Sequence, residues 1–489
     1  MPLPVPDGAA KLISPGADAT EVSVAPAAER ERLDLSVWKI AAVALFGGLL
    51  AQLDATIVNV SLSTLAVNLH ASLATIQWVT SGYLLALTLV LPLSGWLVDR
   101  IGGRALYLWC FAGFTLTSAL CALAWSASSL IAFRLLQGLA GGLLAPMAQV
   151  MVARAAGKQL ARVAGYMALP MLLAPVLGPV IAGAILQYAS WRWLFLVNLP
   201  VGVLAFLLAL LLLPRDGEET VPRKLDWLGL ALLSPGLTLV LYGADKISDW
   251  VGETALAAGV ALMVAFLWSA RQKGDTALID LRLFRGRVFS IAAITQFLSN
   301  GTQFAGQMLI PAFLIQACDR SPAEIGWMLA PIGLGMMVTY PLMGRLTDRF
   351  GIRHVSAGGA ALAFFATLPF LYFASRGLVL FALLPALFLR GLGTSAVGLP
   401  TLTAAYTAIG KRDLPIATTA LNIVQRLGGP TLTTLCATIL AWKLGSLATG
   451  PAVSAAYAWA FALLCALHIC TALVTSRLPH RLDDLATGT

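Results

Sequence analysis

Long apolar runs, separated by short charged or Gly/Pro/Ser-rich breaks, follow one another along most of the 489-residue chain. Each run has roughly the 20 apolar residues that a helix needs to cross the hydrocarbon core of a bilayer. The pattern predicts fourteen such helices, at 38–61, 76–98, 105–125, 129–152, 162–186, 192–213, 226–243, 254–270, 288–316, 324–346, 354–375, 378–409, 414–442 and 453–475. We therefore expect an all-α integral membrane protein.

Charged stretches at 215–224 and 271–287 set the seventh and eighth runs apart from the others. This indicates two six-helix bundles with two inserted helices. The expected organisation is a loose cytoplasmic tail at 1–35, an N-terminal bundle at 36–214, a two-helix insertion with its loops at 215–285, a C-terminal bundle at 286–478 and a cytoplasmic tail at 479–489.

Composition narrows the class of protein further. Only 11% of the residues are charged and 59% are hydrophobic, whereas a soluble domain carries about 25% charge. The chain could not cover a water-facing surface, which excludes a soluble enzyme, a disordered protein and a nucleic-acid binder. The net charge is +9, and most of the Lys and Arg residues lie in the tails and in every second connection between spans. The connections on the opposite side contain five basic residues, Arg192, Lys246, Arg320, Arg376 and Lys443. By the positive-inside rule both termini are expected in the cytoplasm.

An internal repeat supports the division into two halves. The pattern PLxGxLxDRxGxR begins at Pro92 and again at Pro341, an offset of 249 residues. Each copy ends the second span of its half and enters a loop on the basic side. Two homologous bundles are the usual construction of a secondary transporter, whose site lies between them.

These motifs resemble the major facilitator superfamily. The repeated loop is similar to the GxLxDRxGR signature of this superfamily. The segments at 53–60 (LDATIVNV) and 191–200 (WRWLFLVNLP) resemble its fourteen-span drug:proton antiporters. The resemblance covers roughly residues 36–478. The resemblance implies the major facilitator fold and proton-coupled export of hydrophobic or amphiphilic compounds by alternating access. It also implies a monomer in the bacterial inner membrane, with a small-molecule substrate and protons as its partners and with no cofactor. The last outer connection, about 443–453, is shorter than in members that bind a periplasmic adaptor, so no adaptor partner is carried over.

The resemblance assigns roles to two motifs. The loop residues are expected to form a cytoplasmic gate, in which acid–base contacts lock one state: Gly95, Asp99, Arg100, Gly102, Arg104, Gly344, Asp348, Arg349 and Arg353. The alternative is that they mark a solvated loop.

In the fifth span, Gly178, Pro179 and Gly183 are similar to the antiporter motif GxxxGPxxGG, and a Gly-Pro pair there would bend the helix. The alternative is an ordinary kinked helix with a small-residue face.

Charged residues within the spans carry the expected coupling chemistry. Asp54 is the one carboxylate well inside a predicted span, where it costs about 2.5–3.5 kcal/mol to insert. We interpret it as a proton carrier, with a permanent structural salt bridge as the alternative. Arg134 resembles the basic residue of the family motif RxxQGxxxG and is expected to approach Asp54. For Arg134 and Arg390, anchoring by snorkelling is the alternative.

Polar residues at helical spacing suggest a substrate cavity. Gln296, Asn300, Gln303 and Gln307 share one face of the ninth span, which should meet either the cavity or another helix. The expected cavity set is Asp54, Asn59, Arg134, Gln137, Asn300, Gln303, Gln307, Gln425 and Arg426. His468 stands alone in an apolar run and is interpreted as a packed core residue.

No hydrolytic set, metal-ligand cluster or phosphate-binding GxxxxGK[ST] loop can be recognised in the sequence. Transport energy should therefore come from an ion gradient. Two other functions fit the same residues. One is an exporter of a single metabolite, such as an organic acid or a metal chelate, and the other is a receptor that keeps the fold without transport.

Overall fold

The computed structural model describes residues 35–215, 224–247, 249–320, 322–410, 412–446 and 451–480. The expected tails at 1–35 and 479–489, and residues 447–450 of the last outer connection, fall almost entirely outside these ranges. Within them the chain is helical and contains no strand.

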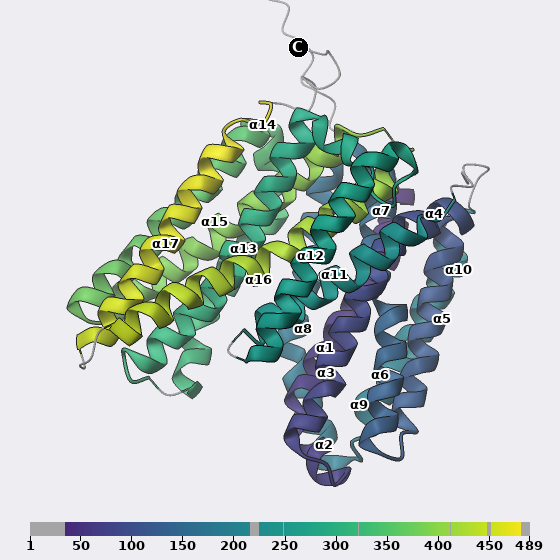
Figure 1. Ribbon diagram of the computed structural model, residues 1–489, viewed down its shortest axis with the longest axis horizontal. Coiled ribbons are helices and arrows are strands. Elements are labelled where there is room, and N and C mark those ends of the chain that lie inside the picture. Colours follow the sequence, from purple (N-terminus) through teal and green to yellow (C-terminus); the bar gives the residue numbers. More distant parts are fainter. Residues whose placement is uncertain are drawn as a thin grey trace, which may run out of the picture. The chain divides into compact units, whose positions relative to one another are not determined.

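The N-terminal bundle and the insertion are built from successive helices (Figure 1). The bundle comprises α1 (Leu35–Val60), α2 (Leu62–Asn68), α3 (Leu73–Val90), η1 (Leu91–Leu93), α4 (Ser94–Ile101), α5 (Gly103–Ala122), α6 (Ala127–Gly141), α7 (Leu144–Ala156), η2 (Gly157–Gln159), α8 (Leu160–Tyr188), α9 (Trp193–Leu196) and α10 (Asn198–Leu212). The insertion comprises α11 (Trp227–Asp245), α12 (Trp250–Lys273), η3 (Gly274–Thr276) and η4 (Leu281–Arg285).

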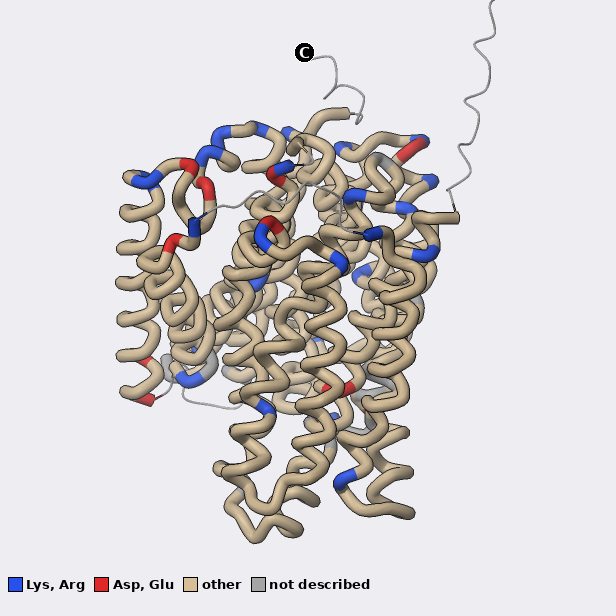
Figure 2. Tube along the Cα trace, turned by 90° about the vertical axis from the view of Figure 1, so that its right-hand side faces the viewer, with Lys and Arg blue, Asp and Glu red and all other residues tan. Residues whose placement is uncertain are grey.

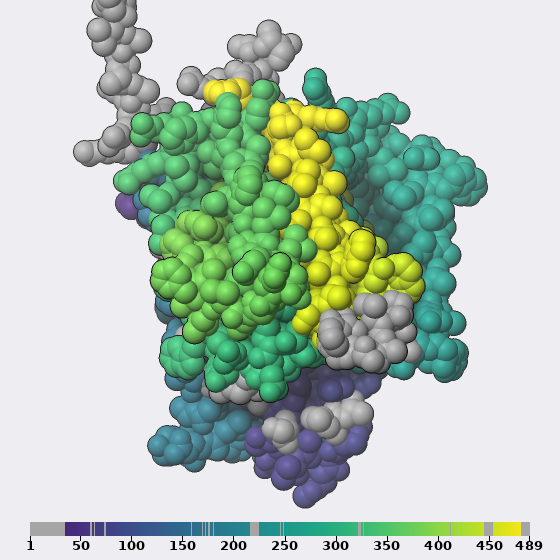
Figure 3. All heavy atoms as spheres, turned by 90° about the vertical axis from the view of Figure 1, so that its left-hand side faces the viewer, coloured from purple at the N-terminus to yellow at the C-terminus, as the bar shows by residue number. Residues whose placement is uncertain are grey.

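The C-terminal bundle uses fewer and longer helices. It comprises α13 (Arg287–Gln316), α14 (Pro322–Arg376), α15 (Leu380–Thr407), α16 (Leu414–Ser446) and α17 (Pro451–Thr475). Figure 3 shows α17 on the outer face of this bundle, where it packs along α14. Aromatic rings fill the core behind it, with Phe313 within 5.5 Å of Tyr457 and 5.4 Å of Phe461 between centroids.

Each of the fourteen predicted apolar runs falls on a helix or on consecutive helices, and two of them share α14. By length and composition, ten stretches of the described residues could cross a membrane, and one of these, Trp327–Arg376, spans both runs of α14. The other three predicted runs fall on the helices α8, α13 and α16. The fold is therefore the predicted all-helical one, with two six-helix bundles and two inserted helices.

The two loop motifs adopt the same backbone. Gly102 has φ +87° and ψ 155°, and Gly351, its repeat partner inside α14, has φ +79° and ψ 157°. A residue with a side chain is strained at such φ values, so glycine is required to turn the chain between spans. The following arginines also match, because Arg104 Nη2 donates to Leu210 O and Arg353 Nε donates to Leu478 O, each over 2.6 Å.

Lys and Arg gather at one end of the bundles, hereafter the basic end, where the loop motifs lie (Figure 2). Side-chain hydrogen bonds between the bundles occur here in the described part of the chain. Ser94 and Thr419 hydroxyls lie 2.7 Å apart, and Gln149 Oε1 accepts from Tyr406 over 3.2 Å and from Asn422 over 2.7 Å. The two bundles are therefore held together at the basic end.

The motif glycines Gly95 and Gly344 lie where the bundles meet. A Cβ on Gly95 would stand 3.0 Å from Thr419 Oγ1, and one on Gly344 would stand 2.5 Å from Arg162 Cβ. Each glycine thus lets the second span of its own bundle approach the fifth span of the other bundle. The paired contacts, α4 with α16 and α14 with α8, follow the two-fold relation of the repeat.

The insertion also contacts both bundles. Helix α11 packs against α3 through the stacked rings of Trp78 and Tyr242, 6.2 Å between centroids. It meets α16 where Thr434 Oγ1 donates to Ala244 O over 3.5 Å.

Candidate functional site

The contact expected between Asp54 and Arg134 is present in the core of the N-terminal bundle. Arg134 Nη1 on α6 lies 2.6 Å from Asp54 Oδ2 on α1, and neither side chain has any solvent exposure. Helix α6 begins at a capping box formed by Ser126 and Ser129, which fixes its start two turns before the arginine. The geometry excludes snorkelling for Arg134, because its charge is buried rather than carried to the membrane surface.

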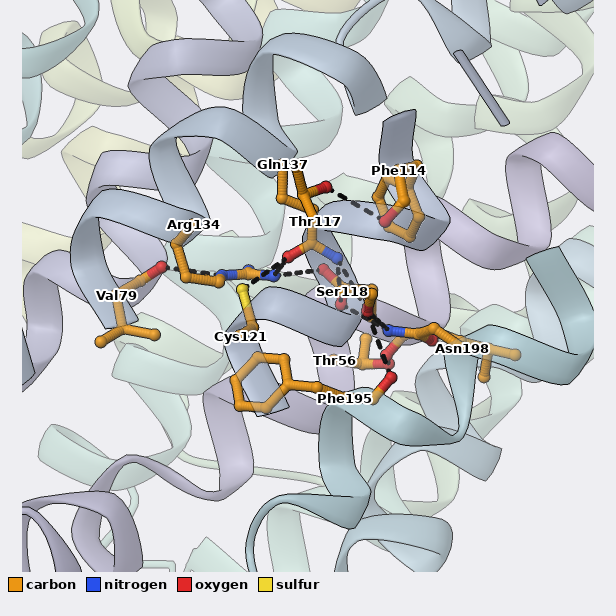
Figure 4. Close-up of polar contacts among 12 residues, drawn as sticks. Thr56, Val79, Phe114, Thr117, Ser118, Cys121, Arg134, Gln137, Phe195 and Asn198 are labelled. Carbon is orange, nitrogen blue, oxygen red and sulfur yellow. Dashed lines mark hydrogen bonds and ion pairs between the residues drawn. The ribbon is translucent and has the colours of Figure 1, made fainter. Parts of the chain in front are cut away.

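Neutral donors complete the coordination of the Asp54 carboxylate, and Figure 4 labels the residues around it that donate or relay these bonds, Gln137, Asn198 and Ser118. Asp54 Oδ1 accepts from Asn198 Nδ2 over 2.8 Å and from Gln137 Nε2 over 3.2 Å. Ser118 Oγ receives a second hydrogen bond from each of these amides, and itself donates to Phe195 O over 3.1 Å. Four helices, α1, α5, α6 and α10, thus meet at one buried acid.

The guanidinium of Arg134 is held from several sides. Its Nε donates to Val79 O over 3.1 Å, its Nη1 also donates to Gln137 Oε1 over 2.7 Å, and its Cζ lies 4.1 Å from the centroid of the Tyr83 ring. Its Nη2 has no hydrogen-bond partner among the described residues.

A second buried arginine occupies the C-terminal bundle. Arg390 on α15 is only 3% exposed, which corrects the snorkelling alternative for this residue. Its Nη1 donates to Thr367 Oγ1 over 2.7 Å and lies 3.2 Å from His468 Nε2, and its Nη2 donates to Thr302 O over 3.1 Å. His468 is buried as expected, but it is a polar partner of Arg390 as well as a packed core residue.

The polar stripe of α13 divides between two environments. Gln296 bonds to another helix through Nε2 and Gly398 O, 2.8 Å apart, and Asn300 lies beside Gly429. Gln303 and Gln307 line a cavity of about 90 Å³ together with Arg390. Gln425 and Arg426 on α16 are half-buried and do not line this cavity, so the expected cavity residues do not form one continuous surface.

The remaining motif residues lie as follows. Asp99 is buried, whereas Arg100, Asp348 and Arg349 are exposed at the basic end. Gly178 packs closely on α1, since a Cβ there would stand 2.2 Å from Thr56 Oγ1, but Gly183 has no neighbour within 4 Å of a Cβ position. Close packing is therefore found at Gly178, whereas Gly183 lies on an exposed part of α8, and the kink expected from the motif stays a prediction. The side chains of Asn59 and Pro179 lie outside the described part of the structure.

Two members of the Asp54 network were missed in the sequence. Asn198 belongs to the segment 191–200, and an amide within an apolar run was the signal that could have identified it. Ser118 gives no such signal, because a serine in a membrane helix usually bonds to its own backbone.

Comparisons with known proteins agree with this architecture. Residues 44–431 match the sequence profile of the Major Facilitator Superfamily, and residues 290–484 match it again. The chain is 34% identical over 421 residues to "Multidrug resistance protein B homolog" of Mycobacterium tuberculosis, covering 84% of this chain and 78% of that protein. It is 35% identical over 328 residues to "Putative multidrug resistance protein MdtD" of Salmonella typhi, covering 66% of this chain and 69% of that protein.

Solved structures show the same fold at low sequence identity. A bacterial homologue of the iron transporter ferroportin, in an outward-facing state, aligns with a TM-score of 0.64 at 12% identity, over 92% of this chain and 99% of that chain. The proton:xylose symporter XylE aligns with a TM-score of 0.63 at 14% identity, over 93% and 99%. The chain therefore belongs to the major facilitator superfamily, as a multi-pass membrane transporter rather than an enzyme.

Proposed function

We propose that this protein is a proton-coupled exporter of hydrophobic or amphiphilic compounds in a bacterial inner membrane, with both termini in the cytoplasm. The observation that carries the proposal is the fully buried Asp54–Arg134 pair. The multidrug-resistance relatives support the substrate class, and the basic loops support the orientation by the positive-inside rule.

Alternating access accounts for the contacts between the bundles. With the basic end in the cytoplasm, the bonds of Ser94 with Thr419 and of Gln149 with Tyr406 and Asn422 close the cytoplasmic side. The loop motifs would then act as the cytoplasmic gate, and Gly178 would keep α8 against α1. Rocking of one bundle against the other would break these bonds and open the site inward.

Asp54 would carry the proton in this cycle. When Asp54 is ionised, its charge offsets that of Arg134 at 2.6 Å, and the amides of Gln137 and Asn198 satisfy the other oxygen. Protonation from outside would remove the ion pair and leave Arg134 as an uncompensated cation, which is costly in a buried site. That cost would drive rearrangement of α1 against α6, and proton release to the cytoplasm would restore the pair.

Proton movement in everted membrane vesicles tests this proposal. The vesicle lumen is acidified, and ethidium and 1-naphthoate are added separately while a pH-sensitive dye reports proton release. Wild type and Glu253→Gln, which removes an exposed carboxylate of α12, should release protons with a transported compound. Asp54→Asn should not. Proton release by Asp54→Asn equal to wild type would reject Asp54 as the carrier.

A double variant separates the carrier from a structural salt bridge. Asp54→Asn combined with Arg134→Gln removes both charges and leaves neither one buried without a partner. If the pair has only a structural role, the double variant should keep coupled transport. A proton carrier cannot be replaced in this way, and the double variant should remain uncoupled. Flux of labelled compound in the same vesicles distinguishes both cases from a receptor, which shows no flux.

A further inference from the structure

We propose that the cavity beside Arg390 in the C-terminal bundle binds the anionic head group, a carboxylate, of the transported compound. This inference rests on the proposed function and names the charge class of one substrate group. It assigns to the C-terminal bundle a binding role separate from the proton chemistry of Asp54.

The first support is the chemistry around Arg390. Its described partners, Thr367, His468 and Thr302 O, are all neutral, and no described carboxylate pairs with it. A guanidinium only donates hydrogen bonds, so His468 Nε2 acts as the acceptor and the histidine is neutral. A buried cation without a counter-ion is costly, and an anionic ligand would remove that cost.

The second support is the distribution of carboxylates. The predicted spans of the C-terminal bundle, between 288 and 475, contain one acidic residue, Glu324, which stands at the first position of its span. Away from the span ends, the same bundle holds two arginines, Arg390 and Arg426. In the N-terminal bundle the arginine of the fourth span, Arg134, is paired with Asp54, and Arg390 lies in the fourth span of the C-terminal bundle.

The internal repeat shows which residue replaces that acid. Asp54 precedes Pro92 by the same number of residues as Gln303 precedes Pro341, the two prolines that begin the loop motifs. Gln303 therefore stands at the repeat position of Asp54, and it lines the same cavity as Arg390. The C-terminal bundle therefore has a buried arginine in its fourth span but an amide at the repeat position of the acid, which leaves room for a carboxylate that arrives with a ligand.

The shape of the cavity suits a head group. Its volume of about 90 Å³ is that of about three water molecules, enough for a carboxylate but not for the body of an amphiphile. Three described bonds use three of the five guanidinium N–H groups, and Nε–H makes none with a described residue. The unused donors can meet a carboxylate in two-point geometry.

Gly306 and Gln307 define the two sides of this site. A Cβ on Gly306 would lie 1.9 Å from Arg390 Nη2, so only glycine lets α13 approach the guanidinium. Gln307 lines the cavity and is exposed, which places it at the mouth. The apolar body of a ligand would extend past Gln307 and along the apolar lining residues Ile310, Pro311 and Ile332.

A matched pair of probes tests the proposal on the full chain in lipid nanodiscs. Binding of 1-naphthoate and of its neutral isostere 1-naphthamide is measured by calorimetry at neutral pH, with empty nanodiscs as blank. Arg390→Gln should weaken 1-naphthoate binding about tenfold or more and leave 1-naphthamide binding unchanged. Arg426→Gln, which removes the half-buried cation of this bundle, should weaken 1-naphthoate binding much less.

Gln307→Glu provides a second variant that does not disturb the buried core. It supplies the chain's own carboxylate at the mouth of the cavity, so it should compete with 1-naphthoate and spare 1-naphthamide. Equal binding of the two probes to wild type, or equal loss of both in Gln307→Glu, would overturn the proposal. Failure here is distinct from failure of the exporter proposal, because proton release by wild-type and Asp54→Asn vesicles tests coupling at Asp54 with Arg390 unchanged.

Discussion

Arg104 and Arg353 make the same contact in the two halves of the molecule. Arg104 donates to Leu210 O and Arg353 donates to Leu478 O, each over 2.6 Å, and each acceptor lies near the end of the last helix of its own bundle. A hydrogen bond from a charged group contributes about 1.5–3 kcal/mol when buried and less when exposed. Because the Arg353 bond is part-buried and the Arg104 bond is exposed, Arg353→Gln should lower the thermal unfolding midpoint more than Arg104→Gln. Arg100→Gln, an exposed control in the same loop, should leave it unchanged.

The buried pair in the N-terminal bundle should show strong energetic coupling. Arg134→Gln leaves Asp54 buried without its counter-ion, which should cost about 3–5 kcal/mol, and Asp54→Asn strands Arg134 in the same way. The double variant should lose less than the sum of the two. Unfolding in mixed micelles with increasing denaturing detergent measures this cycle, and strict additivity would show that the charges do not interact.

Replacement of the loop glycines should separate backbone strain from packing. Alanine at Gly102 or Gly351 would have to adopt a combination of φ and ψ that is essentially confined to glycine, at a cost of about 1–3 kcal/mol. In Gly351→Ala the added Cβ would also stand 2.3 Å from His480 O, so this variant should be the less stable of the two. Gly183→Ala meets open space in a helix and should gain up to about 1 kcal/mol. Thermal unfolding of the purified variants measures all three, and a Gly351→Ala midpoint equal to wild type would contradict the expected order.

Gln149→Leu should favour opening at the basic end. It removes the acceptor for both Tyr406 and Asn422, and two hydrogen bonds at about 1 kcal/mol each shift the equilibrium about thirtyfold. Spin labels at exposed Arg100 and Arg412, one on each bundle, should report a longer distance by electron–electron resonance. Gln77→Leu is the control, because Gln77 is exposed on α3 and is not among these bonds. An unchanged distance distribution in Gln149→Leu would mean that the bonds do not hold the closed state.

The start of the insertion should be sensitive to acid. Burial alone would raise the pKa of Asp226, but hydrogen bonds from Lys273 and from the backbone N–H groups of Gly229 and Leu278 hold its pKa below the ordinary value. The ionised carboxylate therefore stabilises the folded state above about pH 4, and this contribution is lost as the pH falls through the lowered pKa.

Hydrogen exchange in the first turn of α11 should therefore accelerate below about pH 4, relative to an unstructured peptide. Asp226→Asn keeps a capping side chain but removes the charge, so protection of this turn should be weaker at neutral pH and vary less with acid. Protection in wild type that is independent of acid would contradict the assignment.

The sequence predicted the helices and the Asp54–Arg134 contact for the same physical reason. Apolar runs of membrane length have one stable conformation in a bilayer, and a buried charge there needs a partner. With Asp54 as the one carboxylate well inside a predicted span, the number of possible partners was small, and the family motif selected Arg134. The structure supplies this contact at 2.6 Å.

The neighbours of Arg390 and the division of the α13 stripe could not be read from the sequence. Gln296 and Gln303 lie on one face of α13, but successive turns of this helix face different parts of the bundle, so one amide bonds to Gly398 O and the other lines a cavity. His468 and Arg390 are 78 residues apart and meet only because α15 and α17 lie in one bundle. Spacing along one helix does not specify which helix lies opposite.

The matching backbone at Gly102 and Gly351 bears on how the two bundles arose. An ungapped repeat with the same left-handed turn, followed by an arginine with the same carbonyl contact, is the mark of a duplicated ancestral half. The bundle interiors have diverged since then, with Asp54 in one copy and Gln303 in the other. Gene duplication thus accounts for the turn that both halves share between their second and third spans, while the interior of each bundle carries its own chemistry.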